Sequence, residues 1–187
     1  MSASRRNSSR EQSTKIAFCG LLVALCVVLM LSGGLIPIAT YCAPMAAGIL
    51  LLPVLLEYGK KSAWTAYAAI ALITLMLGID KEAAFFFLFL GYYPIVKWQL
   101  DSIHKKPLRA LAKLAVWNLS IVLMYVLMGF LLHMDAVVAE FTEMGTLMLV
   151  GFVLLFDFCM VLYDRLMMPL VYLYANRLRP KLRFLKS

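Results

Sequence analysis

An apolar run at residues 146–165 (TLMLVGFVLLFDFCMVLYDR) is long enough to cross a bilayer and carries a carboxylate near its middle. At about 1.5 Å per residue, Asp157 lies roughly 17 Å from the start of the run, a little past the centre of a hydrocarbon core about 30 Å thick. An ionisable side chain at this depth is energetically costly, so it is usually turned inward and marks a functional site. The alternative is that Asp157 makes a buried polar contact between helices, and that Asp164 and Arg165 form an interfacial pair.

The composition indicates an integral membrane protein. The chain is 64% hydrophobic and 15% charged, with a mean hydropathy of +0.88, which is too apolar for a soluble domain of 187 residues. Its net charge of +8 does not indicate a nucleic-acid partner, because the basic residues lie between apolar runs rather than in one patch with exposed aromatics. The four cysteines show neither CxxC nor CxxH spacing and predict no zinc or redox site.

Six apolar segments predict an all-α integral membrane protein, folded as a compact bundle of six transmembrane helices. They cover about residues 16–38, 39–56, 63–79, 83–96, 114–132 and 146–165. In the second segment, Pro44 and Pro53 predict kinks or a short unwound start, and Gly59 suits the end of the helix. The fourth segment offers only 14 uncharged residues, which alone would also fit a re-entrant segment.

Lysines and arginines predict the orientation of the bundle, because cytoplasmic loops carry an excess of both. With six spans, sixteen of them fall on the side of the N-terminus, Arg165 lies at the boundary of that side, and only Lys81 lies on the other side. Both termini are therefore predicted to be cytoplasmic, with Asp80 and Asp135 outside, and Lys97 is expected to snorkel to the interface. The chain then divides into a polar, basic cytoplasmic segment (1–14), the six-helix transmembrane domain (15–175) and a basic cytoplasmic tail (176–187).

Few polar side chains remain at membrane depth, and we expect them to line one cavity. Asn118 is the main candidate partner for Asp157, although it would also fit a plain helix-to-helix hydrogen bond. Near the outer edge, the carboxylates of Asp80 and Glu82 precede three phenylalanines at 85–87. This order indicates a charged entrance above an aromatic wall. The alternative is that the phenylalanines only face lipid or pack in the core. The predicted ligand-binding residues are Asp157, Asn118, Tyr92, Tyr93, Asp80, Glu82 and Trp117.

No motif predicts an enzyme. The chain contains no phosphate-binding glycine loop, no HExxH and no GxSxG, and His104 and His133 each stand alone. We therefore predict no catalytic residue, no bound metal and no cofactor.

The beginning of the chain resembles a family of transport proteins. The segments KIAFCGLLVALCVVLML and GGLIPIATYCAPMAAGILLLPVLLEYGKK, in a six-helix chain without an ATPase motif, are similar to the substrate-binding S components of energy-coupling factor (ECF) transporters. This resemblance implies that the chain binds a small, vitamin-like solute, and that a separate coupling subunit and ATPases supply the energy. No signature indicates which solute is bound.

Small residues on the first helix are candidates for contact with that coupling subunit. Ala17, Gly20 and Ala24 recur at spacings that form a stripe where another helix can approach closely. In the family such small-xxx-small positions contact the coupling subunit. Gly20-xxx-Ala24 is the nearest match here to the usual alanine pair.

A noncatalytic scaffold is the alternative function. A chain similar to the rod-shape protein MreD would recruit partners or anionic lipid through its basic cytoplasmic loops. A proton-coupled carrier is a weaker third option, because Asp157 is nearly alone and no inverted repeat is visible. In each case we expect a multi-pass protein of the cell membrane that is surrounded by lipid.

Overall fold

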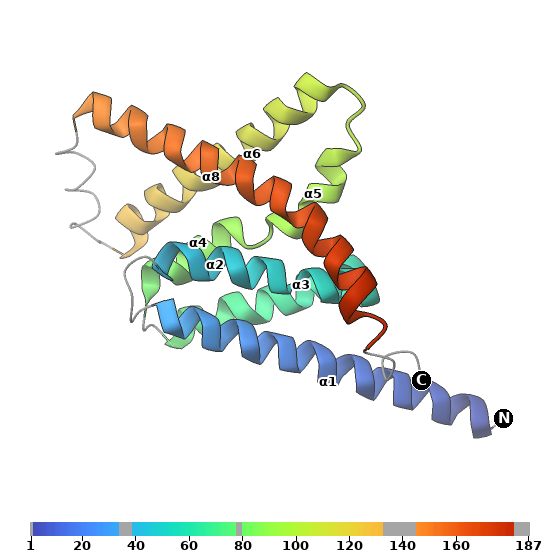
Figure 1. Cartoon of the computed structure of the whole chain (residues 1–187). Coiled ribbons are helices and arrows are strands. Elements are labelled where there is room, and N and C mark those ends of the chain that lie inside the picture. Colours follow the sequence, from blue (N-terminus) through green and yellow to red (C-terminus); the bar gives the residue numbers. More distant parts are fainter. Residues whose placement is uncertain (1, 34–38, 78–79, 133–144, 182–187) are drawn as a thin grey trace.

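A computed structural model of the chain describes residues 2–33, 39–77, 80–132 and 145–181. In these ranges the regular secondary structure is entirely helical, as the sequence predicts (Figure 1). The helices are α1 (Ser2–Gly33), α2 (Ala39–Leu50), α3 (Leu52–Leu77), α4 (Lys81–Leu90), α5 (Tyr93–Asp101), α6 (Lys106–Leu132) and α8 (Thr146–Leu173), and a π-helical turn, η1 (Tyr174–Leu178), continues α8.

The helices fit a multi-pass membrane protein. Four helical segments are long and apolar enough to cross a membrane, and a fifth is added if the bent pair α2 and α3 forms one span. The four are Arg10–Ser32, Lys81–Asp101, Lys106–Phe130 and Thr146–Leu178. The short fourth apolar segment of the sequence lies within the second of these, because α4 and α5 together extend it to 21 residues. Six spans, as predicted from the sequence, would require the bent pair to cross twice.

The second and third predicted helices are divided differently in the structure. Leu51 alone separates α2 from α3, and the two axes meet at a bend of 68°. Pro53 follows this break as the second residue of α3, a position where its missing N–H is tolerated, whereas Pro44 lies inside α2. Gly59 has φ 77° and ψ −179°, so the predicted helix stop is present as a kink within α3.

Two apolar clusters meet at α4. The first joins α1, α2 and α3 and includes Phe87, and the second joins α6 and α8 and includes Phe85 and Phe86. All three phenylalanines are buried, so they are packing residues rather than the wall of an open mouth. The layers in Figure 1 follow this division, with α1, α2 and α3 on one side and α6 and α8 crossing on the other.

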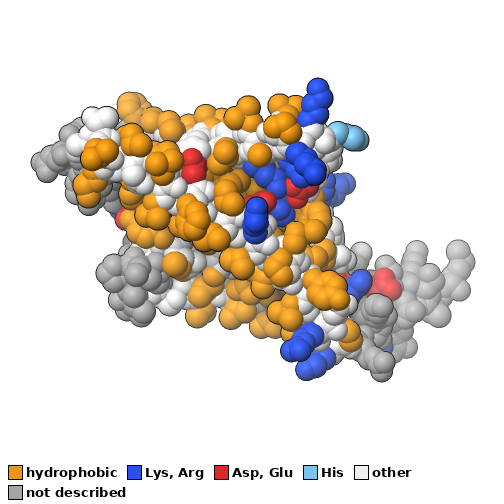
Figure 2. All heavy atoms as spheres, turned by 45° about the horizontal axis from the view of Figure 1, so that its top comes forward, with side chains coloured by type: hydrophobic (Ala, Val, Ile, Leu, Met, Phe, Trp, Pro, Cys, Tyr) orange, Lys and Arg blue, Asp and Glu red, His pale blue; other side chains and the backbone are white. Residues whose placement is uncertain are grey.

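Positive charge collects at one end of the bundle. The beginning of α1, the connection from α5 to α6, and η1 all lie at this end (Figure 1). Lysine and arginine side chains gather there on the face drawn in Figure 2, while hydrophobic side chains cover most of the remaining described surface of that face. An asymmetry of this kind is the pattern on which the positive-inside rule is based.

Candidate functional site: a ring of charges beside a basic hollow

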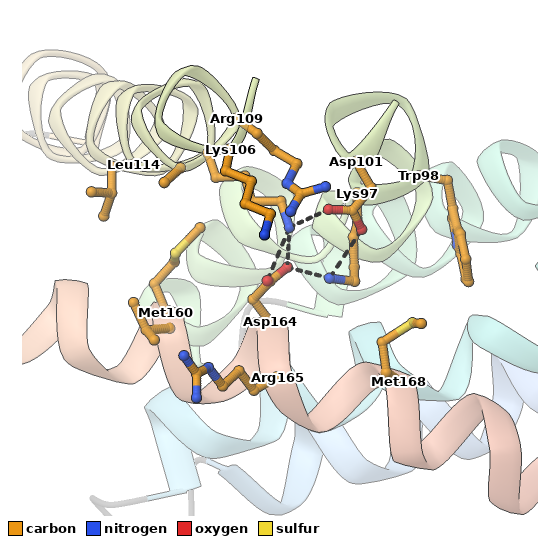
Figure 3. A pocket seen from close by; sticks show the side chains of 13 residues that line it. Lys97, Trp98, Asp101, Lys106, Arg109, Leu114, Met160, Asp164, Arg165 and Met168 are labelled. Carbon is orange, nitrogen blue, oxygen red and sulfur yellow. Dashed lines mark hydrogen bonds and ion pairs between the residues drawn. The ribbon is translucent and has the colours of Figure 1, made fainter. Parts of the chain in front are cut away.

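Four charged side chains from three helices form a closed ring, drawn in Figure 3. Lys97 and Asp101 lie on α5, Lys113 on α6 and Asp164 on α8. Lys97 Nζ is 3.3 Å from Asp101 Oδ2 and also binds Asp164 Oδ1. Lys113 Nζ is 2.5 Å from Asp101 Oδ1 and 2.9 Å from Asp164 Oδ2. Because each lysine contacts both aspartates, the four charges cancel within the ring.

Local helix geometry and burial explain why the ring is closed. Lys97 and Asp101 are four residues apart on α5 and therefore lie on one helix face. Lys97 is only 3% exposed and Lys113 only 8%, so each ammonium group needs a countercharge. Tyr93, one turn before Lys97, adds a further bond by donating its hydroxyl hydrogen to Asp164 Oδ1 at 2.8 Å. The ring thus ties α5, α6 and α8 together.

The ring borders a hollow of about 750 Å³ between α5, α6 and α8. Three further cations line this hollow, namely Lys106 and Arg109 at the start of α6 and Arg165 on α8. Lys106 and Arg109 extend from α6 toward the ring in Figure 3. None of the three forms an ion pair with a carboxylate of the described residues. We call Lys106, Arg109 and Arg165 the rim.

Two expectations from the sequence are wrong at this site. Lys97 does not snorkel to the interface, because its ammonium group turns inward to two aspartates. Asp164 binds the two ring lysines rather than Arg165, which is exposed. Adjacent residues on a helix point about 100° apart, and Figure 3 shows Arg165 directed away from the Asp164 carboxylate. The ring was not predicted from the sequence, although the i,i+4 spacing of Lys97 and Asp101 is a signal that could have indicated it.

Asp157 and Asn118 meet, as the sequence predicts. Asn118 Nδ2 donates to Asp157 Oδ1 at 2.8 Å and lies 3.1 Å from the carbonyl oxygen of Leu114. A smaller hollow of about 240 Å³ between α6 and α8 is lined by Asn118, but its other lining residues are apolar or aromatic and do not include Asp157. The contact has the form of a helix-to-helix hydrogen bond, and a ligand role for this pair stays a prediction.

The aromatic members of the predicted ligand-binding set make contacts with residues other than Asp157. Tyr92 shares a hydrogen bond of 2.7 Å with Ser120, and Tyr93 belongs to the ring. Trp117 is 2% exposed, packs edge to face against Tyr93 with centroids 5.8 Å apart, and its Nε1 has no hydrogen-bond partner among the described residues. Their binding roles also stay predictions.

The predicted outer carboxylates make local contacts at the beginning of α4. Asp80 caps this helix by accepting from the Ala83 N–H at 2.9 Å, and it accepts a second bond from Thr40 Oγ1 at 3.0 Å. Glu82 accepts from the Tyr41 hydroxyl at 3.1 Å. Since α4 starts at the end of the bundle opposite to the ring, these carboxylates belong to a different part of the molecule (Figure 1). Asp135 lies outside the described residues.

The small-residue stripe of α1 faces outward. Ala17, Gly20 and Ala24 are exposed, and a Cβ atom added at Gly20 would meet nothing within 4 Å. The inner face of α1, which includes Cys26 and Met30, packs into the first apolar cluster. No part of the described chain covers the stripe.

Comparisons of the chain with protein-family models, with curated proteins and with solved structures found no match. Among the described residues, no group of three or more His, Cys, Asp or Glu is placed to hold a metal ion. The function is therefore argued from the geometry of the ring, the hollow and the stripe.

Proposed function

We propose that this protein is a noncatalytic, solute-binding subunit of the cell membrane, similar in role to the S component of an ECF importer. The observation that carries the proposal is the hollow between α5, α6 and α8. Its volume of about 750 Å³ lies in the range of small-molecule sites, about 300–1,000 Å³, and convergent charged groups line it. A closed ion-pair ring with two buried lysines joins the three walls.

The proposal places both termini in the cytoplasm. The hollow lies at the basic end of the bundle, which the positive-inside rule assigns to the cytoplasmic side. This is the side on which an imported solute has to be released. Lys81 lies at the opposite end and would face outward, whereas Lys105, in the connection from α5 to α6, would face the cytoplasm.

Separate partners would supply the energy for import. The uncovered stripe at Ala17, Gly20 and Ala24 supports a coupling subunit on α1, because small side chains permit close approach of a second helix. ATPases would act through that subunit.

A membrane scaffold similar to MreD remains the second candidate, and the rim favours it. The three rim cations, which form no ion pair within the described part of the chain, would attract anionic lipids or acidic partners as well as solutes. A scaffold would use the same hollow without moving a solute.

Native mass spectrometry of the gently extracted protein tests the proposal. We expect a retained small molecule and a coupling partner, and we expect Gly20→Leu to remove the partner while the solute is kept. Gly151→Leu is the matched control, because Gly151 is also an exposed helical glycine with nothing within 4 Å of an added Cβ atom. Recovery of cell-wall or division proteins without an ATPase would contradict the proposal and favour the scaffold.

Cysteine labelling tests the orientation. In a background without native cysteines, an impermeant maleimide should label Lys81→Cys in intact cells and leave Lys105→Cys unlabelled until the cells are opened. Both positions are exposed in the structure, so a reversed pattern would place the basic end outside.

A further inference from the structure

More cationic than anionic side chains line the large hollow, and this excess indicates an anionic ligand. Five cationic and two anionic side chains line it. The two aspartates and the two buried lysines neutralise one another in the ring, which leaves the three rim cations without countercharge among the described residues. We propose that the rim binds the phosphate group of a ligand that occupies the hollow. This inference deepens the proposed function and rests on it only in using the same hollow.

Phosphate suits the rim better than a carboxylate does. A phosphate monoester carries close to two negative charges and three acceptor oxygens, whereas a carboxylate carries one charge and two oxygens. Arg109 and Arg165 each present a planar fork that binds phosphate oxygens in pairs, and Lys106 adds a point charge. One phosphate group can therefore pair with more of the rim cations than one carboxylate can.

The start of α6 adds to the attraction. Lys106 is the first residue of α6, and Arg109 follows three positions later, so their side chains share one helix face. The positive end of the α6 dipole lies at this same turn and favours an anion there. Both side chains extend toward the ring in Figure 3.

The ligand also contacts apolar surface. Besides the charged residues, the hollow is lined by Leu114, Met160, Val161 and Met168. A phosphate group attached to an apolar portion satisfies both parts of the lining. Such chemistry comes from two sources, a small phosphate ester or the headgroup of an anionic lipid, and the experiment has one arm for each.

The first arm titrates the purified full-length protein in detergent with glycerol 3-phosphate at constant ionic strength. Trp98 lines the hollow, so its fluorescence reports binding, and Trp98→Phe identifies its share of the signal. The second arm uses native mass spectrometry to count phosphatidylglycerol retained from mixed micelles, with phosphatidylcholine as the zwitterionic reference.

Matched charge variants separate the rim from general attraction. The rim variant is Lys106→Gln, Arg109→Gln and Arg165→Gln, and the control variant is Lys60→Gln, Lys61→Gln and Arg177→Gln. The control residues are exposed and do not line this hollow. At about fivefold for each cation removed, the rim variant should bind on the order of a hundredfold more weakly, while the control variant stays within about fivefold of the wild type. If the rim variant does not fold, Arg109→Gln and Arg165→Gln singly should each lose about fivefold.

The arms distinguish this inference from the proposed function. Rim-dependent binding of the ester supports both. Rim-dependent retention of the lipid alone supports the phosphate site and overturns small-solute binding in this hollow. Retention of a neutral solute with no response in either arm keeps the proposed function and overturns the phosphate site. Equal losses in the two variants, or equal binding of a poly-glutamate peptide, would also overturn the phosphate site.

Discussion

Asp157 and Asp164 lie seven residues apart on α8, and both bind a side chain of α6, yet their surroundings differ. Among the described residues, Asp157 has one neutral side-chain partner, the amide of Asn118. Asp164 has two buried lysines and the Tyr93 hydroxyl. Asp157, near the middle of the apolar run, therefore has fewer described side-chain partners than Asp164, which lies near the end of the run.

The difference shows that depth along an apolar helix does not by itself identify the important carboxylate. A lysine has a long apolar stem and can bring its charge inward from a membrane boundary as well as outward to it. Near the basic end of the bundle, α5 and α6 each supply such a lysine, and Asp164 lies where both can reach it. At Asp157 the neighbouring part of α6 supplies no cation, and Asn118 is the polar group within reach.

The largest expected effect is that of Asp164→Asn. Removing this charge leaves two buried lysines with Asp101 as the shared countercharge, and breaking a buried pair in this way costs about 3–5 kcal/mol. Thermal or denaturant unfolding in detergent measures the loss. Arg165→Gln is the adjacent control and should stay within about 0.5 kcal/mol. A loss below about 1 kcal/mol at Asp164 would show that the ring contributes little to stability.

Replacing the whole ring sharpens this prediction. The variant Lys97→Met, Asp101→Leu, Lys113→Met and Asp164→Leu removes all four charges together and leaves none unpaired. Because apolar replacement of a complete buried network is often neutral or stabilising, we expect it to unfold at least as late as Asp164→Asn, and closer to the wild type. An equally large loss would mean that packing, rather than unpaired charge, limits stability at this site.

Tyr93→Phe should have an intermediate effect. It removes a hydrogen bond to a charged carboxylate, which contributes about 1.5–3 kcal/mol. Tyr92→Phe is the matched control, because the Tyr92 hydroxyl meets the neutral Ser120 hydroxyl and should contribute about 1 kcal/mol. Equal losses from the two variants, measured by unfolding, would argue against a charged Asp164.

Asp157→Asn should have the smallest effect on stability. It keeps the shape of the side chain, and an interhelical hydrogen bond in a membrane contributes about 0.6 kcal/mol on average. Asp157→Leu should raise the melting temperature if the carboxylate is retained at a cost for function. If Asp157 binds a polar or cationic solute, Asp157→Asn should also weaken capture more than tenfold, or about 1.4 kcal/mol. Unchanged capture with a sharp loss of stability in both variants would make Asp157 a structural residue.

The sequence by itself determined the class of the protein and its local features. Composition and long apolar runs predict helices that could span a membrane, because the backbone groups of a segment within a bilayer have to be satisfied internally. The helix stop at Gly59 and the pairing of Asn118 with Asp157 also followed from the sequence. Gly59 permits a positive φ that other residues rarely adopt, and Asp157 had few polar partners available at membrane depth.

Only the tertiary structure decided which charges meet. Asp164 is 67 residues from Lys97 and 51 residues from Lys113, and no periodicity relates positions so far apart. Whether Lys97 turned outward or inward depended on α8 bringing a carboxylate to α5. The three phenylalanines of α4 were likewise assigned to the core by the two helix layers that enclose them. A hydrophobic pattern predicts which side chains avoid water, but which residues they contact depends on how the helices pack.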